Sequence, residues 1–342
     1  MLLPSLRESR YETARPHAHS GRGMPDVARP RPHPHAADRP TQHRIQAPQE
    51  PISDVISRED LHTIEQSAAS WRADDGEAAA QLAGRHGFAM SACTSSTARR
   101  QTLQSGGWCL GKMVKDKLYG RERAVPIRGG GGSFRLPASH VLADLLLLHW
   151  IKNITDGCRH SVNDLGAGVG QYGRELVSEG LQWSGFDGAG DVEEFTGGFV
   201  RFADLTMPLA LPRADWVISL ETGEHVPRRH ELMLIRNLHA HNRCGVLLSW
   251  ACCNGGHQHV NLRPNGFVIN AFERLGYRYD AARSEGMRNP RLRERLRHNN
   301  SNRVYGWFAS SVMLFVRRNP LPGAGCLASL GAARARPACK VD

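Results

Sequence analysis

Short apolar runs alternate with helix-like stretches along the second half of the chain. The strand-like runs are 159–165, 182–187, 199–204, 214–220, 244–251, 277–280 and 306–317. Apolar residues recur at helical spacing over 170–180, 227–240 and 263–275, and a further helix is expected from a Ser139 cap to about Ile154. Alternation of this kind predicts an α/β fold with a mostly parallel sheet covered by helices.

The first hundred residues lack this alternation. Residues 1–50 contain 8 Pro, 8 Arg and 5 His, which leaves too little apolar surface to offset the entropy of ordering. One helix is expected at about 57–82, and the glycine run 129–132 is expected to be a flexible connection. We therefore predict a mostly disordered extension over 1–104, one domain over 105–318, and a disordered tail over 319–342.

The charge is distributed unevenly. The chain has 342 residues and a formal net charge of +11, which invites a nucleic-acid partner. However, residues 161–224 hold 3 basic and 11 acidic side chains, a net of −8, whereas 101–140 and 283–303 each carry +5. The charge distribution does not indicate nucleic acid. The Arg-rich segment 283–303 is expected to be a solvated helical insertion or to contact an acidic or phosphate-bearing substrate.

The chain shows none of the usual export or membrane signals. Its eight cysteines are scattered without a C-x-x-C, too sparse for a disulfide scaffold. No apolar run approaches the roughly 18 residues of a membrane-spanning helix, and the N-terminus has no secretory apolar core. We expect a reduced, intracellular, cytoplasmic protein with no membrane partner, and an organelle transit peptide stays open.

The strongest local signal is "VNDLGAGVGQYGREL". A strand ends at Asp164, and Gly166, Gly168 and Gly170 precede a helix whose N-terminus presents free N–H groups. Glycines suit a tight turn that a ligand approaches closely. The pattern fits both S-adenosylmethionine and, with Gly173 completing G-x-G-x-x-G, a dinucleotide.

Acidic residues end the strands that follow. Asp187 ends the next strand, where an acid can accept from ribose hydroxyls, and Asp204 ends the third. The run "ADWVISLETGEHVP" then delivers Glu221, Glu224 and His225 to the carboxyl edge of the sheet. A hydride-transfer enzyme has no reason for this cluster, which favours S-adenosylmethionine over a nicotinamide cofactor.

Seven segments between residues 158 and 318 together carry a family resemblance: "DLGAGVGQYG", "GFDGAG…EEFT", "ADLT", "ADWVISLETGEH", "LLSWA", "GGHQHVN" and "GYRYD". They resemble class I S-adenosylmethionine-dependent methyltransferases and, more narrowly, the group around vertebrate methyltransferase-like protein 24. The resemblance implies a Rossmann-like class I methyltransferase fold, with a seven-stranded mostly parallel sheet, helices on both faces and an antiparallel last strand. It implies S-adenosyl-L-methionine as cofactor and no settled methyl acceptor. The sequence departs from the group at Thr222, where Val is usual, and in its first 100 residues, which do not look like a signal-anchored ectodomain.

The resemblance also implies roles for individual residues. The predicted cofactor-binding residues are Asp164, Gly166, Gly168 and Gly170 around the methionine part, Asp187 at the ribose, Asp204 with Leu205 at the adenine, and Glu221. A turn or helix-cap role for Asp204 stays open. Transfer needs a base only where the acceptor is protonated, and the candidates are His225, His257 and His259, with a plain polar-loop role open for the last two.

The spacing Glu221-x-x-Glu224-His225 raises the question of a metal. It resembles the divalent-ion site of the small-RNA 3′-end and ubiquinone O-methyltransferases, where His257 or His259 would be a further ligand. The same spacing occurs in methyltransferases without metal, where these residues are structural, so the sequence commits to no metal ligand. Cys252 and Cys253 could join the two histidines around zinc, but adjacent cysteines rarely reach one ion.

Three functions follow in order of preference. The first is an S-adenosylmethionine-dependent methyltransferase with an unknown acceptor. The second is a non-catalytic adaptor that keeps the same fold, and the third is an NAD(P)-dependent oxidoreductase. The oligomeric state is not indicated.

Overall fold

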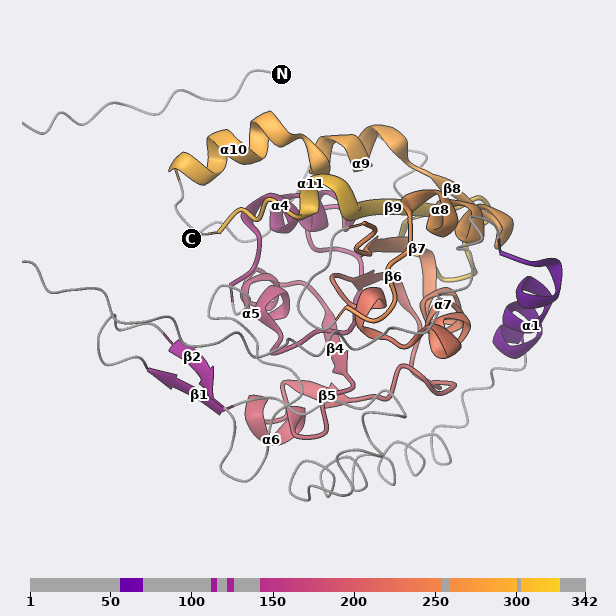
Figure 1. Ribbon diagram of the computed structural model, residues 1–342, viewed down its shortest axis with the longest axis horizontal. Coiled ribbons are helices and arrows are strands. Elements are labelled where there is room, and N and C mark those ends of the chain that lie inside the picture. Colours follow the sequence, from indigo (N-terminus) through magenta and orange to yellow (C-terminus); the bar gives the residue numbers. More distant parts are fainter. Residues whose placement is uncertain are drawn as a thin grey trace, which may run out of the picture. The chain divides into compact units, whose positions relative to one another are not determined.

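The computed structural model describes residues 56–69, 112–115, 122–125, 142–253, 259–299 and 303–326. Its main sheet has seven strands in the order β5-β4-β3-β6-β7-β9-β8 (Figure 1). Pairings from β5 to β7 are all parallel, and β9 runs antiparallel to both of its neighbours. This order with a reversed last strand is the Rossmann-like class I methyltransferase fold, so the predicted fold class is confirmed. A separate hairpin pairs β1 (Lys112–Lys115) with β2 (Glu122–Val125).

The seven strands of the main sheet all fall within the apolar runs seen in the sequence or next to them. They are β3 (Val162–Leu165), β4 (Trp183–Asp187), β5 (Val200–Phe202), β6 (Ala214–Ser219), β7 (Asn242–Ser249), β8 (Tyr277–Tyr279) and β9 (Val312–Arg317). β6 is buried along its whole length, as a parallel strand covered on both faces requires. The last strand begins later than predicted, because Phe308–Ser311 forms the short helix α11 before it.

Helices cover both faces of the sheet, as predicted. One face packs on α1 (Arg58–Ala69), α7 (Glu231–Ala240) and α8 (Asn265–Arg274), and the other on α4 (Leu145–Ile154), α5 (Gln171–Ser178), α9 (Ala281–Arg288) and α11. Alternate residues of β6 point to opposite faces of the sheet. Val217 packs in the core on the α1, α7 and α8 side, whereas Trp216 and Ile218 pack in the core on the α4 and α5 side. Shorter elements are α6 (Val192–Thr196), η2 (Gly223–His225), η3 (Arg228–His230) and the helix α10 (Pro290–Asn299). Within these described ranges, no helix is long and apolar enough to cross a membrane.

The helix α1 belongs to the core, although it lies in the segment predicted to be mostly disordered. Ile56, Leu61 and Ile64 are buried beside α7, and Arg274 donates to the carbonyl of Ile56. The rest of the extension, the glycine run 129–132 and the chain beyond 326 lie outside the described residues. The boundary at 104 therefore stays a prediction.

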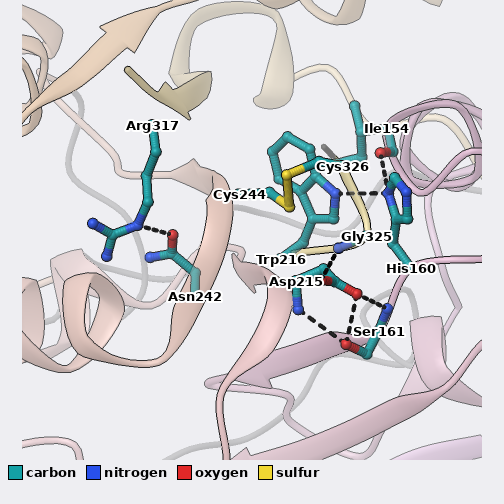
Figure 2. The surroundings of a disulfide bond; sticks show 10 residues. All are labelled: Ile154, His160, Ser161, Asp215, Trp216, Asn242, Cys244, Arg317, Gly325 and Cys326. Carbon is teal, nitrogen blue, oxygen red and sulfur yellow. Dashed lines mark hydrogen bonds between the residues drawn. A yellow bond between two sulfur atoms is a disulfide. The ribbon is translucent and has the colours of Figure 1, made fainter. Parts of the chain in front are cut away.

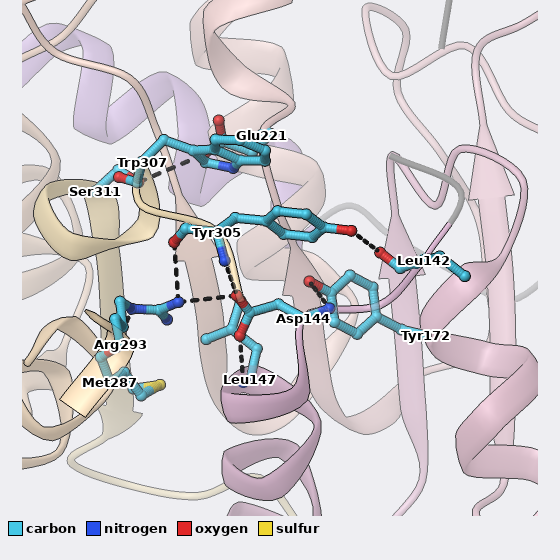
Figure 3. Close-up of polar contacts among 10 residues, drawn as sticks. All are labelled: Leu142, Asp144, Leu147, Tyr172, Glu221, Met287, Arg293, Tyr305, Trp307 and Ser311. Atoms are coloured by element: carbon cyan, nitrogen blue, oxygen red, sulfur yellow. Dashed lines mark hydrogen bonds and ion pairs between the residues drawn. The ribbon is translucent and has the colours of Figure 1, made fainter. Parts of the chain in front are cut away.

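An acidic residue caps α4 and ties the Arg-rich segment to the sheet (Figure 3). The predicted cap Ser139 lies outside the described residues; the helix begins later, and Asp144 accepts from the backbone N of Leu147 at 2.9 Å. The same carboxylate accepts from Arg293 Nη1 and from the backbone N of Tyr305, both at 2.8 Å. Because Asp144 and Arg293 are both buried, the part of the Arg-rich segment that forms α9 and α10 is folded, and Arg293 is a structural arginine.

A disulfide corrects the expectation of reduced cysteines. Cys244 in β7 is bonded to Cys326, 82 residues further along the chain (Figure 2), and Cys158 is disulfide-bonded as well. The segment that carries Cys326 is fixed beside β6, because the backbone N of Gly325 donates to Asp215 Oδ1 at 2.8 Å. Ordered chain therefore continues past residue 318. Cysteines so far apart show no spacing pattern, so the sequence alone did not reveal the pair.

Candidate active site

The predicted glycine turn joins β3 to α5. Gly166, Gly168 and Gly170 have φ angles of 89°, 58° and 77°, the left-handed region that glycine adopts without strain. A Cβ at Gly166 would lie 2.2 Å from Thr222 Oγ1, whereas the nearest atom to a Cβ at Gly168 would be 3.5 Å away. The turn therefore packs closely against the segment after β6 and leaves space beside Gly168, at the N-terminus of α5.

Asp187, at the end of β4, holds this turn from the neighbouring strand. Its Oδ2 accepts from the backbone N of Gly168 at 2.8 Å, and its Oδ1 accepts from that of Ala189 at 2.9 Å. Burial raises the pKa of Asp187 to about 6 against the opposing effect of these two donors. Each carboxylate oxygen can still accept a further hydrogen bond, so Asp187 lies where a hydroxyl-bearing ligand beside the glycine turn would meet it.

Asp164 lies in β3, directly before the turn, and is only 3% exposed. Burial raises the pKa of this carboxyl to about 8, and the negative charge of Asp187 adds to the effect. A carboxylate in such surroundings is stabilised by a nearby positive charge. The acidic pair therefore favours a cationic ligand over an anionic one.

Gly173 is explained by packing rather than by a ligand. A Cβ at Gly173 would lie 2.5 Å from the ring of Trp183, and one at Gly185 would lie 2.0 Å from the same ring. Trp183 in turn stacks on Phe199 with ring centroids 4.9 Å apart. The last glycine of G-x-G-x-x-G therefore carries no information about the class of ligand.

Asp204 and Leu205 follow β5 at the same edge of the sheet. Asp204 Oδ1 accepts from the backbone N of Thr206 at 3.0 Å and from its Oγ1 at 2.5 Å, which is the turn role left open by the sequence. Leu205 is 5% exposed and packs in the core. A role of these two residues at the adenine stays a prediction.

Glu221, directly beyond β6, has strained backbone. Its φ is 53°, which costs a residue other than glycine about 1–3 kcal/mol. The backbone N of Glu221 donates to Ser249 Oγ at 2.7 Å, and that hydroxyl donates to Glu221 Oε1 at 2.8 Å. Ser311 Oγ donates to the same oxygen at 3.4 Å (Figure 3). Neither serine could be predicted from the sequence, because both are common residue types 28 and 90 positions away.

Three of the predicted polar residues meet beside Glu221. The ligand atoms of Glu224, His225 and His259 all lie within 4.8 Å of one another, and the two imidazole rings meet edge to face at 5.0 Å. Glu224 is fully buried; this burial, followed by the charge of Glu221, raises its pKa well above the ordinary range. His257 lies outside the described residues. The structure thus joins His259 to the acid and histidine of η2, and the side chain of Glu221 interacts with Glu224 from outside this group.

An aromatic pair, missed in the sequence, lies near Glu221 (Figure 3). Tyr305 and Trp307 stack with centroids 4.5 Å apart and planes 6° apart, and Trp307 remains 40% exposed. Ser311, which donates to Glu221, also donates to the carbonyl of Trp307 at 3.3 Å. The sequence pattern assigned Trp307 to the closing strand, because its apolar neighbours continue into β9.

No family model matches the chain. No curated protein matches it either, so the narrower resemblance to the group around methyltransferase-like protein 24 stays a prediction. Among solved structures, magnesium protoporphyrin IX methyltransferase from Synechocystis PCC 6803 with bound SAH is 17% identical, covering 50% of this chain and 80% of that one, with a TM-score of 0.36.

Two further solved structures are similar to the same extent. The YcgJ protein from Bacillus subtilis is 15% identical, covering 50% of this chain and 98% of that one, with a TM-score of 0.34. An O-methyltransferase family protein from Burkholderia thailandensis is 14% identical, covering 51% and 55%, with a TM-score of 0.34. At these scores the assignment of the fold rests on the strand order and directions described above.

Proposed function

We propose that this protein is an S-adenosylmethionine-dependent methyltransferase whose acceptor is still to be identified. The observation that carries the proposal is the edge of β3 and β4, where the glycine turn is held by Asp187 and preceded by the buried Asp164. The glycines let a ligand approach the backbone at the start of α5, and the acids suit a ligand with positive charge. The net charge of −8 over residues 161–224 adds a longer-range attraction.

The proposal assigns each part of the cofactor to its own residues. The assigned residues are Asp164, Gly166, Gly168 and Gly170 for the methionine part, Asp187 for the ribose hydroxyls, Asp204 and Leu205 for the adenine, and Glu221 beside β6. The geometry of the turn supports the first two assignments most directly, because Asp187 already contacts the backbone of Gly168. The resemblance to the methyltransferase-like protein 24 group implies the same cofactor without naming an acceptor.

The bound cofactor supplies a methyl group on a positively charged sulfur, which reacts readily with a nucleophile. The residues of the chain then have to orient the acceptor, exclude water and, for a protonated acceptor, remove a proton. His225 and His259 are partly exposed at this edge, and imidazole exchanges protons near neutral pH. His257 is the third candidate base, and Trp307 offers an exposed ring on which a planar acceptor can stack.

The other two functions make different demands on the same edge. An oxidoreductase would carry G-x-G-x-x-G, and the packing of Gly173 on Trp183 suits that motif as well as it suits a methyltransferase, so the glycines do not separate the two functions. An adaptor would keep the cofactor site and transfer nothing. The adaptor is therefore distinguished from the proposal by a transfer assay, and the oxidoreductase by the cofactor that binds.

The test incubates the purified full chain with methyl-labelled S-adenosylmethionine and fractionated lysate. We expect label in an acceptor fraction with the wild type and with Asp156→Asn, and its loss with Asp187→Asn. Asp156 is a matched control, because it precedes β3 and so lies at the opposite edge of the sheet from the glycine turn. Cofactor binding without transfer to any fraction would favour the adaptor. Binding of NAD(P) in place of S-adenosylmethionine would establish the oxidoreductase.

A further inference from the structure

The group formed by Glu224, His225 and His259 has the composition of a metal site. Each residue offers one ligand atom, and these atoms lie within 4.8 Å of one another. A metal about 2.0–2.2 Å from each ligand needs the three atoms somewhat closer together. Rotation of the two imidazoles can bring them closer, because both rings are partly exposed.

Backbone hydrogen bonds, rather than flexible side chains alone, hold the two contributing segments together. The carbonyl of Glu224 accepts from the backbone N of Val260 at 2.8 Å and of Asn261 at 3.0 Å. The carbonyl of Asn261 accepts from Trp250 Nε1 at 2.8 Å, at the end of β7. The residue after His259 is therefore fixed directly on η2, and the meeting of the two histidines is a property of the fold.

The side chain of Glu224 gives an independent sign that a cation belongs here. Its exposed fraction is 0%, and within the part of the chain that the structure describes no donor meets either carboxylate oxygen with full hydrogen-bond geometry. The side chain of Glu221 and the backbone of Ala251 interact with the group but leave both oxygens open to a cation. Leaving a buried carboxylate without donors is costly, and such groups in proteins are normally paired or bound to metal. A cation between Glu224 and the imidazoles would satisfy it.

We propose that Glu224, His225 and His259 bind a divalent transition-metal ion of the zinc class. Two imidazoles and one carboxylate are ligands that zinc shares with manganese and cobalt, whereas calcium and magnesium prefer oxygen alone. Three protein ligands leave at least one coordination position for water or an oxygen of a substrate. Glu221 lies outside this group of ligand atoms, and its Oε1 accepts from Ser249 and Ser311.

The metal site stands without the proposed function, and only its use by an acceptor rests on that function. In the loaded protein, His225 and His259 are ligands and no longer proton acceptors. A hydroxyl acceptor that occupies the open position would lose its proton more easily, because a bound divalent ion lowers the pKa of a coordinated oxygen. The site therefore favours acceptors that present a hydroxyl oxygen.

The test measures Zn²⁺ bound by the full chain after treatment with a chelator and dialysis. The chain has 17 histidines, so the result is a difference between variants rather than a total. We expect the wild type to bind one ion more than Glu224→Gln or His225→Asn, whose affinity for that ion falls by about 100-fold or more. The matched controls His149→Asn and Glu294→Gln, both exposed on helices away from the cluster, should keep the ion.

Equal Zn²⁺ content in folded wild type and folded cluster variants would overturn the proposal. Circular dichroism without metal establishes whether each variant is folded. If the variants are unfolded, the visible spectrum of the Co²⁺-loaded wild type decides. Nitrogen and oxygen ligation supports the site, whereas thiolate charge-transfer bands from Cys252 or Cys253, or no bound Co²⁺, overturn it.

Calorimetric titration with S-adenosylhomocysteine on the same samples separates the two proposals. A wild type that binds S-adenosylhomocysteine but no Zn²⁺ at this cluster contradicts only the metal site. A wild type that binds Zn²⁺ but neither S-adenosylhomocysteine nor S-adenosylmethionine contradicts only the proposed function.

Discussion

The two halves of the sheet edge differ in how their acidic groups are satisfied. In the cofactor half, formed by β3, β4, β5 and their loops, Asp187 and Asp204 each accept hydrogen bonds from residues close to them in the turns. In the acceptor half, where we propose that the methyl acceptor binds, the described residues are η2, 249–253, 259–261 and 305–311. There the buried carboxylate of Glu224 receives no hydrogen bond of full geometry from the described residues. Asp187 and Asp204 are therefore satisfied within the chain, whereas we propose that a cation satisfies Glu224.

The two halves also differ in how far apart in the sequence their contacting residues lie. The glycine turn and its acids come from one stretch of sequence, 164–206, which carries its own turn chemistry. The acceptor half brings together segments from β6, β7 and the chain before β9. We therefore expect the cofactor half to respond to local substitutions and the acceptor half to depend on distant ones.

The largest effect is expected from Arg293→Ala. Removing Arg293 leaves the buried charge of Asp144 without its ion-pair partner and lowers the free energy of unfolding by about 3–5 kcal/mol. Arg295→Ala, on the exposed side of the same helix, should change it by less than about 0.5 kcal/mol. Urea denaturation measures both variants. Because Arg293 also donates to the carbonyl of Tyr305, the loss reaches the segment before β9, and an effect no larger than that of Arg295→Ala would contradict the dependence of this region on distant contacts.

A smaller loss of stability, about 3 kcal/mol, is expected for Gly166→Ala. The substitution combines a left-handed φ with a Cβ 2.2 Å from Thr222 Oγ1. Gly180→Ala is the control, since its φ is 97° but no atom lies within 4 Å, so that only the strain of about 1 kcal/mol remains. Adding Thr222→Ala should restore part of the difference in thermal unfolding. Equal losses for the two glycines would show that the turn does not pack on η2.

Asp187→Asn should weaken S-adenosylhomocysteine binding by about 10- to 100-fold. The substitution replaces the carboxylate that accepts from the backbone N of Gly168 and that is proposed to accept from the ribose hydroxyls. A hydrogen bond to a charged group contributes about 1.5–3 kcal/mol. Zn²⁺ binding by the acceptor half should not change. Fluorescence or calorimetric titration measures the affinity, and unchanged affinity would remove Asp187 from the site.

The smallest effect is a proton released on cofactor binding. With a pKa of about 8, Asp164 is mostly protonated at pH 7 in the free protein, and a cationic ligand lowers that pKa. Affinity should therefore rise with pH up to about 8 and level off above it, by at most about tenfold per pH unit. The measurement is the binding enthalpy in two buffers of different ionisation enthalpy, and identical enthalpies would contradict the role of Asp164.

The cofactor half could be predicted because its signals are local. Each strand is a short apolar run, and the conformation of the glycine turn can be predicted because glycine is the residue that tolerates positive φ. Asp164 and Asp187 follow from their positions at strand ends. The sequence even suggested the reversal of the last strand, through its family resemblance.

The rest depends on contacts between distant residues. The cap of α4 is Asp144 rather than Ser139, because Asp144 also binds Arg293 and Tyr305, well over a hundred residues further along. The pairing of Cys244 with Cys326 has no local signature, and neither has the use of Ser249 to hold Glu221. His259 joins His225 through backbone bonds to Glu224 that no spacing rule predicts.

The central claim is that the glycine turn with its two acids binds a cationic methyl donor. Calorimetric titration of the full chain with S-adenosylmethionine, and separately with NAD⁺, tests this claim most directly. The account predicts one saturable site for S-adenosylmethionine, retained in Asp156→Asn, and no heat from NAD⁺. No binding of S-adenosylmethionine or S-adenosylhomocysteine at millimolar concentration would contradict it.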